Sequence, residues 1–263
     1  MAISKDELGN ASALDYILKG GGRLYVSDFG QNNFVYIGET HEIAQNFEVT
    51  KNSIPSTESC PAGVLLEYVE STVLNINFSS YSSTPENIAR FFLGETTAGQ
   101  TEVSDEVVSI TAKKGVYFEV GYINLTDGSV VVTNEDDTVT YVEGTDYVVD
   151  YGAGMLGITQ DGSIIDGDTI KVTLSAGDAG EEVQYLKGEA KDVSLKFVGC
   201  AENGEPVVVD FYKVQLAGNG DAPLKGNEPI SIAFTGGCSP DPSKPANGSI
   251  SQYATMKYIN KAV

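Results

Sequence analysis

Side chains that could perform acid–base or nucleophilic chemistry are few and scattered in this sequence of 263 residues. Its single histidine, His41, lies in a strand-like pattern between Glu39 and Glu42, where a solvated surface residue is the simplest interpretation. No nucleophile elbow, phosphate-binding loop or zinc-protease motif occurs. The many carboxylates could pair for glycoside hydrolysis, but a sugar site also offers aromatic platforms, and tryptophan is absent. We therefore expect no enzyme and no catalytic residue.

Metal-binding patterns are equally weak. The acidic runs 135–137 and 166–168 offer hard oxygen ligands of the kind that calcium prefers, but neither continues into a calcium-loop pattern, which favours acidic hairpin turns. The cysteines, Cys60, Cys200 and Cys238, are widely spaced and odd in number, so they form neither a disulfide framework nor a zinc site. We expect free thiols in a reducing cytosol, no metal and no cofactor.

Charge is the most pronounced feature of the composition. The chain carries 37 acidic and 16 basic residues, for a net charge of −21. A surface this acidic repels nucleic acid and anionic membranes, so neither is expected as a bound partner. The charge serves either solubility or a surface that must not attract a passing polyanion, and charge alone does not separate these. Charged residues at positions 5, 6, 7 and 15 interrupt any apolar run, which predicts neither a signal peptide nor a membrane span.

Short runs rich in Val, Tyr, Thr and Ile, broken by Gly, Asp and Asn, predict an all-β fold. Two long strands, 42–51 and 64–78, flank a polar loop at 52–63. The second has 15 residues, against the usual five or six, and predicts a tall barrel or a hairpin that projects beyond its subunit. Other strands are expected at 22–29, 33–37, 129–133, 138–142, 147–150, 154–159, 169–175, 184–200, 206–217 and 229–235.

Alternation along the two long strands separates an apolar from a polar face. The apolar face holds Ile43, Phe47, Val49, Leu66, Tyr68, Leu74, Ile76 and Phe78. The polar face holds Glu42, Asn46, Glu48, Thr50, Glu67, Ser71, Asn75 and Asn77. Because the apolar face must be buried within the subunit, the polar face is expected to contact water.

One helix is expected at 85–93. Thr84 is a good N-cap, Pro85 suits the first helical position, and Gly94 would end the helix. Its apolar residues, which would pack against a sheet, are Ile88, Phe91 and Phe92.

Four regions follow from these patterns. Residues 1–20 form an N-terminal arm that ends at the triplet Gly20–Gly22, and the arm is either a docking element or a disordered tail. Residues 21–114 and 186–263 form the two parts of a core, the second with a C-terminal segment. Residues 115–185 carry 14 acidic residues against one basic residue, and are either an elaboration of the main sheet or a small inserted β domain.

Several stretches, in this order along the chain, resemble the major tail (tail tube) proteins of long, non-contractile-tailed bacteriophages. They are 22–27 with 35–40, the two long strands running into 84–94, and 141–150 with 165–172. The resemblance covers roughly residues 20–215. The loop 52–63 departs from it, because this loop is poorer in charge than the family pattern.

The resemblance implies a β-sandwich or barrel tail-tube fold with one short α-helix. Six subunits would form a ring, rings would stack into a tube in the virion tail, and each subunit would add four long strands to an inner β-barrel. Twenty-four strands spaced ~4.8 Å apart and tilted ~40° give a diameter of about 48 Å, wide enough for a DNA duplex. The implied partners are other copies, the tape measure protein, the tail terminator and the distal tail proteins. Assembly would occur in the host cytoplasm.

The resemblance also assigns roles to particular residues. DNA would pass without specific binding through a lumen lined by Glu42, Glu48, Glu67, Asn75 and Asn77. Contacts between rings or subunits would involve Asn52, Ile54, Pro55, Thr57, Ile88, Phe91 and Phe92. The alternative is a β-sandwich binding module, such as a virion decoration or surface adhesin domain. That alternative accounts for the acidic Asp/Gly turns but not for the long strands.

Overall fold

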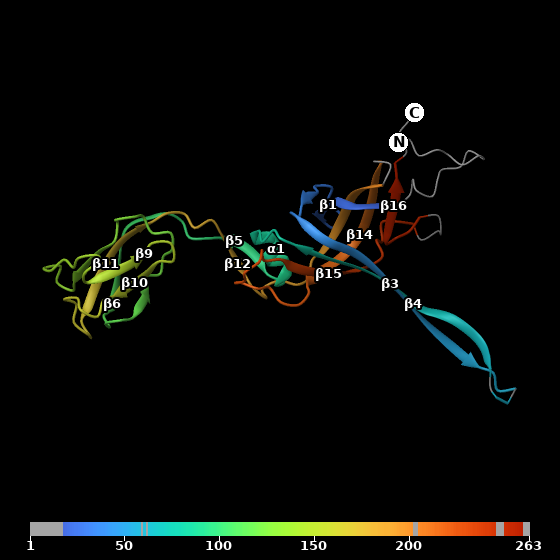
Figure 1. The fold of residues 1–263 in the computed structure, drawn as a ribbon, viewed down its shortest axis with the longest axis horizontal. Coiled ribbons are helices and arrows are strands. Elements are labelled where there is room, and N and C mark those ends of the chain that lie inside the picture. Colours follow the sequence, from blue (N-terminus) through green and yellow to red (C-terminus); the bar gives the residue numbers. More distant parts are fainter. Residues whose placement is uncertain (1–17, 59, 62, 202–204, 246–249, 260–263) are drawn as a thin grey trace. The chain divides into compact units, whose positions relative to one another are not determined.

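The computed structural model describes residues 18–58, 60–61, 63–201, 205–245 and 250–259 (Figure 1). The fold is predominantly β with one short helix, which confirms the all-β prediction. The chain divides into two compact units, which we call unit 1 (Met1–Glu95 with Val183–Val263) and unit 2 (Thr96–Glu182). The short helix has seven residues, and the described part of the chain holds no helix that could traverse a bilayer.

Unit 1 is built on one antiparallel sheet of eight strands. Its strands are β1 (Leu18–Asp28), β2 (Val35–Tyr36), β3 (Thr40–Pro55), β4 (Val64–Ser80), β13 (Asp192–Ala201), β14 (Pro206–Gly218), β15 (Ile232–Cys238) and β16 (Ala254–Tyr258). The order is β2-β1-β13-β14-β15-β4-β3, and β16 pairs with β14 beside β15. The sheet curves around a core that includes Leu24, Phe78, Leu195, Phe211 and Phe234.

Unit 2 has a hydrophobic core of its own, centred on Val132, Leu156, Ile170 and Leu174. Its strands are β6 (Val103–Thr111), β7 (Tyr117–Glu119), β8 (Val131–Asn134), β9 (Tyr147–Asp150), β10 (Met155–Ile158) and β11 (Thr169–Ala176). They form two three-stranded sheets, β6-β11-β8 and β7-β10-β9. The strands β5 (Glu95–Ala98) and β12 (Glu181–Gln184) pair where the chain passes between the units.

Most expected strands are present, β5, β7 and β16 are additional, and three further corrections apply. The strand expected over 184–200 begins only at Asp192, because the chain turns between β12 and β13, where Leu186 has a positive φ of 56°. Segment 138–142 forms only an isolated bridge, from Thr140 to Thr133. The strand β6 was not expected, because Asp105 and Glu106 interrupt its alternation; pairing with β11 holds it in place.

The glycine triplet also differs from expectation. Gly20–Gly22 lies inside β1 and does not separate an arm from the domain. A Cβ atom at Gly22 would clash with the Phe197 ring, so glycine permits the close approach of β1 and β13. The rest of the expected arm, residues 1–17, lies outside the described residues.

The helix is present as α1 (Pro85–Phe91). The Thr84 hydroxyl accepts a hydrogen bond from the Asn87 N–H at 3.3 Å, which confirms the predicted N-cap. Leu93, with φ of 51°, takes the left-handed conformation after the helix that we expected of Gly94. Phe91 is buried in the core of unit 1, and Ile88 and Phe92 are partly buried against it.

Candidate self-assembly surface

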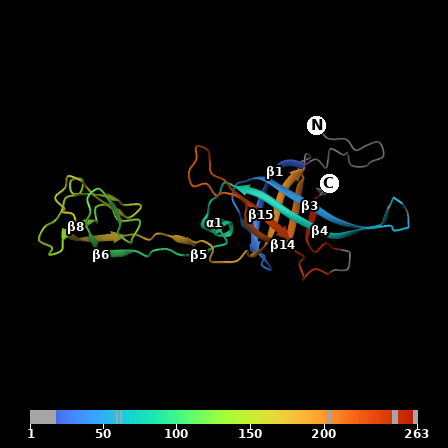
Figure 2. The same ribbon diagram turned by 90° about the horizontal axis from the view of Figure 1, so that it is seen from below.

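The strands β3 and β4 extend beyond the rest of their sheet (Figures 1 and 2). The strand β15 pairs with β4 only over residues 75–80, so the remaining residues of β4 pair with β3 alone. We call residues 47–55 and 64–73 the ribbon. All of these residues are exposed, which means that neither face of the ribbon packs on unit 1.

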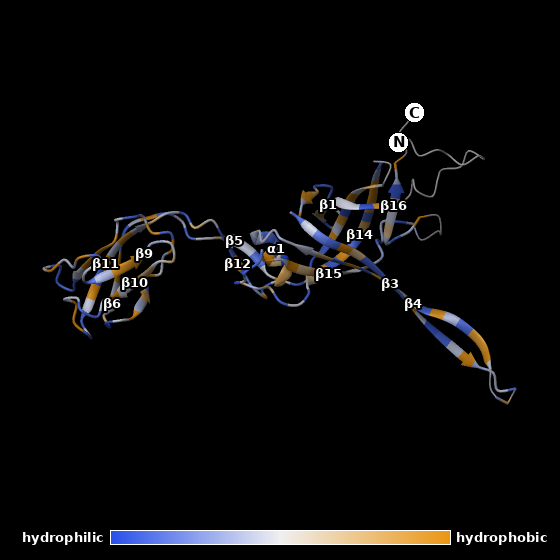
Figure 3. Ribbon diagram, viewed as in Figure 1, coloured by the Kyte–Doolittle hydropathy of each residue, from blue (hydrophilic) through white to orange (hydrophobic). Residues whose placement is uncertain are grey.

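Hydrophobic residues make up much of the ribbon (Figure 3), and their side chains are exposed. They are Phe47, Val49, Ile54, Val64, Leu65, Leu66, Tyr68, Val69 and Val73. Phe47 is 64% exposed and Leu65 is 70% exposed. A two-stranded hairpin alone in water is marginally stable, and contiguous exposed apolar surface marks a site of interaction. The ribbon therefore has the properties of a surface that another chain covers.

The outer edge of β3 is a second feature that favours association. This strand of 16 residues ends the sheet order, and its outer edge has no partner among the described strands. An unpaired edge presents a row of backbone N–H and C=O groups that can pair with another strand. The edge carries only one lysine, Lys51, to oppose such pairing.

Bulges divide the residues that we expected on one polar face. Glu48, Asn75 and Asn77 share a face, because β3 and β4 stay in regular register from Ala44↔Asn77 to Thr50↔Ser71. The register then shifts to Lys51↔Val69, so one extra residue of β4 reverses the alternation. The expectation of a single polar face along the whole strand pair is therefore wrong.

Two predicted lumen residues are affected by these bulges. Glu67 lies opposite Ser53, on the other side of the ribbon from Glu48, and forms an ion pair with Lys51 at 2.7 Å. Glu42 lies in the bulge at the start of β3 with φ of 54°. The side chains of Leu66 and Tyr68, expected beside Leu74, also change sides. Nothing in the local sequence marks these extra residues.

The predicted contact residues fall into two groups. Asn52, Ile54 and Pro55 lie in β3, because the strand continues through the first four residues of the segment that we expected to be a loop. Thr57 is exposed in the remaining turn. By contrast, Phe91 is only 7% exposed and faces the core of its own unit, and Phe92 stacks on Tyr185 with ring centroids 4.2 Å apart. Phe91 and Phe92 therefore pack within unit 1 and do not form the contact surface that we expected of them.

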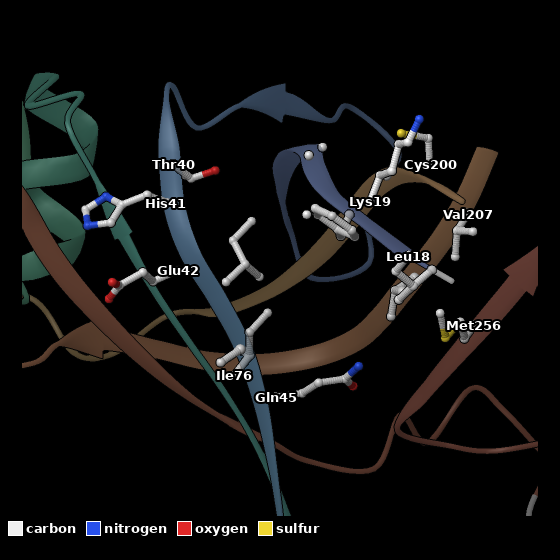
Figure 4. A pocket seen from close by; sticks show the side chains of 18 of the residues that line it. Leu18, Lys19, Thr40, His41, Glu42, Gln45, Ile76, Cys200, Val207 and Met256 are labelled. Carbon is white, nitrogen blue, oxygen red and sulfur yellow. The ribbon is translucent and has the colours of Figure 1, made fainter. Parts of the chain in front are cut away.

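A cavity of about 430 Å³ opens between β1 and β3 (Figure 4). Its lining is mainly apolar and includes Ile76, Phe197, Val209, Phe211 and Met256. His41 and Glu42 come from β3, and Leu18 and Cys200 lie across the cavity from them (Figure 4). His41 stacks on Tyr81 with centroids 4.7 Å apart, and its Nδ1 is buried without a hydrogen-bond partner. Over the residues that the structure covers, no group of three or more His, Cys, Asp or Glu side chains could hold a metal.

Cysteine reactivity offers a direct test of whether the ribbon becomes covered. The cysteines are free thiols; Cys60 is exposed in the ribbon turn, whereas burial raises the pKa of Cys238 to about 11. A maleimide should label Cys60 rapidly in dispersed protein at neutral pH and label Cys238 slowly. After assembly, we expect Cys60 labelling to slow at least tenfold, measured by mass spectrometry of the digested protein. Equal Cys60 rates in dispersed and assembled protein would contradict coverage of the ribbon turn.

Comparison with protein families gives a match over most of the chain. The family model described as "Protein of unknown function UCP028589" matches residues 17–257. No curated protein matches the chain. The matched residues include all of unit 2 and the whole ribbon.

Proposed function

From the premise that the chain belongs to the protein family of unknown function UCP028589, we propose that it is a structural virion protein that polymerises with copies of itself. Six copies form a ring, and rings stack into the tail tube of a long, non-contractile-tailed bacteriophage. The tube lies in the virion tail and conducts DNA during ejection. Its further partners are the tape measure protein, the tail terminator and the distal tail proteins.

The ribbon is the observation that carries this proposal. Both of its faces are exposed, and nine of its residues are exposed large hydrophobic residues. The transfer of such side chains out of water releases roughly 25 cal/mol per Å² of apolar area, so covering them favours association. A copy of the same chain is the partner present at the highest concentration wherever this protein accumulates. The unpaired edge of β3 supports the same partner, because edge-to-edge pairing of copies would continue the sheet into a barrel.

The lining of the proposed bore is more neutral than the net charge suggests. Asn75, Asn77 and Glu48 share the face of β3 and β4 that points away from the core. In the proposed barrel this face meets water and DNA, so amides form most of the bore near β4. Amides carry no net charge and neither attract nor repel phosphate over long distances. Glu48 adds one carboxylate per copy to the bore. Glu67 lies on the opposite side of the ribbon and does not line the bore.

Electron microscopy of the purified full chain tests the proposal. We expect rings and tubes with a central channel wide enough for a duplex, at high protein concentration and in salts that favour assembly. Sedimentation should give a critical concentration above which added protein enters the assembled fraction. A strictly monomeric protein under all of these conditions would refute self-assembly and favour a binding module. Closed rings without a channel would retain self-assembly and refute DNA conduction.

A further inference from the structure

Basic side chains gather on one face of unit 1, although the chain is strongly acidic. In β1, β13 and β14 the side chains of Leu24, Leu195 and Val209 point into the core, so their sequence neighbours point outward. The strand register aligns Arg23, Val198, Val208 and Lys257 in one outward row. The next row holds Tyr25, Lys196, Asp210 and Thr255. We call the basic residues of this surface, Arg23, Lys196, Lys213, Lys244 and Lys257, the cation face.

Most of these lysines are held in place by the sheet beneath them. The Asp210 carboxylate accepts hydrogen bonds from Lys196 at 2.8 Å and from Lys257 at 2.7 Å. Lys213 pairs with Asp192 at 3.1 Å, and Lys244 lies over the Tyr212 ring at 4.5 Å. Fixed charges lose less conformational entropy when a partner binds.

The charges persist at neutral pH. Burial raises the pKa of Asp210, but its hydrogen bonds to Lys196 and Lys257 outweigh burial and hold that pKa below the usual range. The hydrogen bond from Lys257 to Asp210 raises the pKa of that lysine. Five cations against three carboxylates, Asp192, Asp210 and Glu39 (which accepts a hydrogen bond from Tyr36), leave a local charge of 5 − 3 = +2. The whole chain has a charge of −21, so this face contrasts with the rest of the molecule.

The ribbon has the complementary charge. The ribbon carries three glutamates, Glu48, Glu67 and Glu70, and one lysine, Lys51, for a local charge of 1 − 3 = −2. The ribbon also carries exposed apolar side chains, and the cation face is bordered by others. Tyr36, which pairs with the outward-pointing Tyr25, is 43% exposed, and Val198 and Val208 of the first outward row are half-buried.

We propose that the ribbon of one copy docks on the cation face of a second copy. This inference rests on the proposed self-assembly and names its two surfaces. Because the two surfaces differ, the contact is head-to-tail, and such contacts generate closed rings or open helical stacks. A DNA duplex is the weaker match, since its phosphates would pair with the cations but leave the apolar surface of Tyr36, Val198 and Val208 uncovered.

Charge reversal with rescue tests the docking. Arg23→Glu changes an exposed residue of the cation face, and Lys225→Glu, in the exposed loop after β14, makes the same change elsewhere. We expect Arg23→Glu to raise the critical concentration for assembly at least tenfold, because like charges across an interface oppose contact. Lys225→Glu should stay within about twofold of the wild type. Circular dichroism and thermal melting confirm that each variant is folded.

The rescue variant adds Glu70→Lys on the ribbon to Arg23→Glu. The critical concentration for assembly should return to within about threefold of the wild-type value. We expect Lys257→Glu to show the same loss and the same rescue as Arg23→Glu. If Arg23→Glu matches Lys225→Glu, or if the ribbon change restores nothing, the docking proposal fails while self-assembly stands. If the wild type itself never assembles, both proposals fail. Retention of a duplex that Arg23→Glu abolishes, with assembly unchanged, would identify DNA as the partner and overturn the docking.

Discussion

Replacing residues 50–71 by an Asn-Gly turn will give a protein that folds but does not assemble. The turn joins Val49 to Thr72, which lie directly opposite each other, and Asn-Gly suits a two-residue hairpin connection. Every described residue removed is exposed or half-buried and lies outside the core of unit 1, so stability should change by less than about 1 kcal/mol. The critical concentration for assembly should rise more than a hundredfold, measured by sedimentation and electron microscopy.

Two further variants show which part of the ribbon matters. Replacing only the turn, residues 56–63, by Asn-Gly keeps the paired strands; if the turn is the contact between rings, this variant should form rings that do not stack. Shortening the exposed loop 221–228 removes a similar surface segment elsewhere in unit 1 and should leave assembly unchanged. Tubes of normal length from the variant lacking residues 50–71 would show that the ribbon is not the assembly surface.

Phe91→Ala should lower the free energy of unfolding of unit 1 by about 3–5 kcal/mol, the usual cost of removing a buried phenylalanine ring. The Phe91 ring is 7% exposed and meets the Phe92 and Phe234 rings at 4.8 Å and 5.9 Å between centroids. Urea unfolding followed by circular dichroism measures the loss.

Phe92→Ala is the matched comparison. Its ring is only partly buried and stacks on Tyr185, so we expect a smaller loss than for Phe91→Ala. Leu224, which is 92% exposed, provides a surface control whose change to alanine should cost less than about 0.5 kcal/mol. A loss below about 1 kcal/mol for Phe91→Ala would mean that α1 does not anchor the core as described.

The long strands and the helix could be predicted because their signals are local. Thr84 and Pro85 specify a helix start by themselves, and the apolar run to Phe78 specifies a strand wherever it lies. The extra residue between Thr72 and Val69 could not be predicted, because a bulge depends on how two strands align. This one extra residue places Glu67 on the opposite face of the ribbon. The residues that we expected to line the lumen together therefore lie on different faces, although the strand itself was predicted correctly.

The cation face was missed for a related reason. Arg23, Lys196, Asp210 and Lys257 lie on four strands, and the first and last are separated by most of the sequence. Each looks like an ordinary surface charge until the register of the sheet places them side by side. The net charge gave no sign of the cation face either, since a total of −21 does not reveal a local excess of cations.

The paired strands β5 and β12 make unit 2 a modular insertion. The chain enters and leaves through neighbouring positions, because the Gly99 N–H donates a hydrogen bond to the Gly180 carbonyl oxygen at 2.7 Å. A foreign domain whose termini lie close together could be grafted at this point with little additional loop-closure entropy. In a polymer of this chain, one graft per copy would display cargo at a regular repeat along the whole particle.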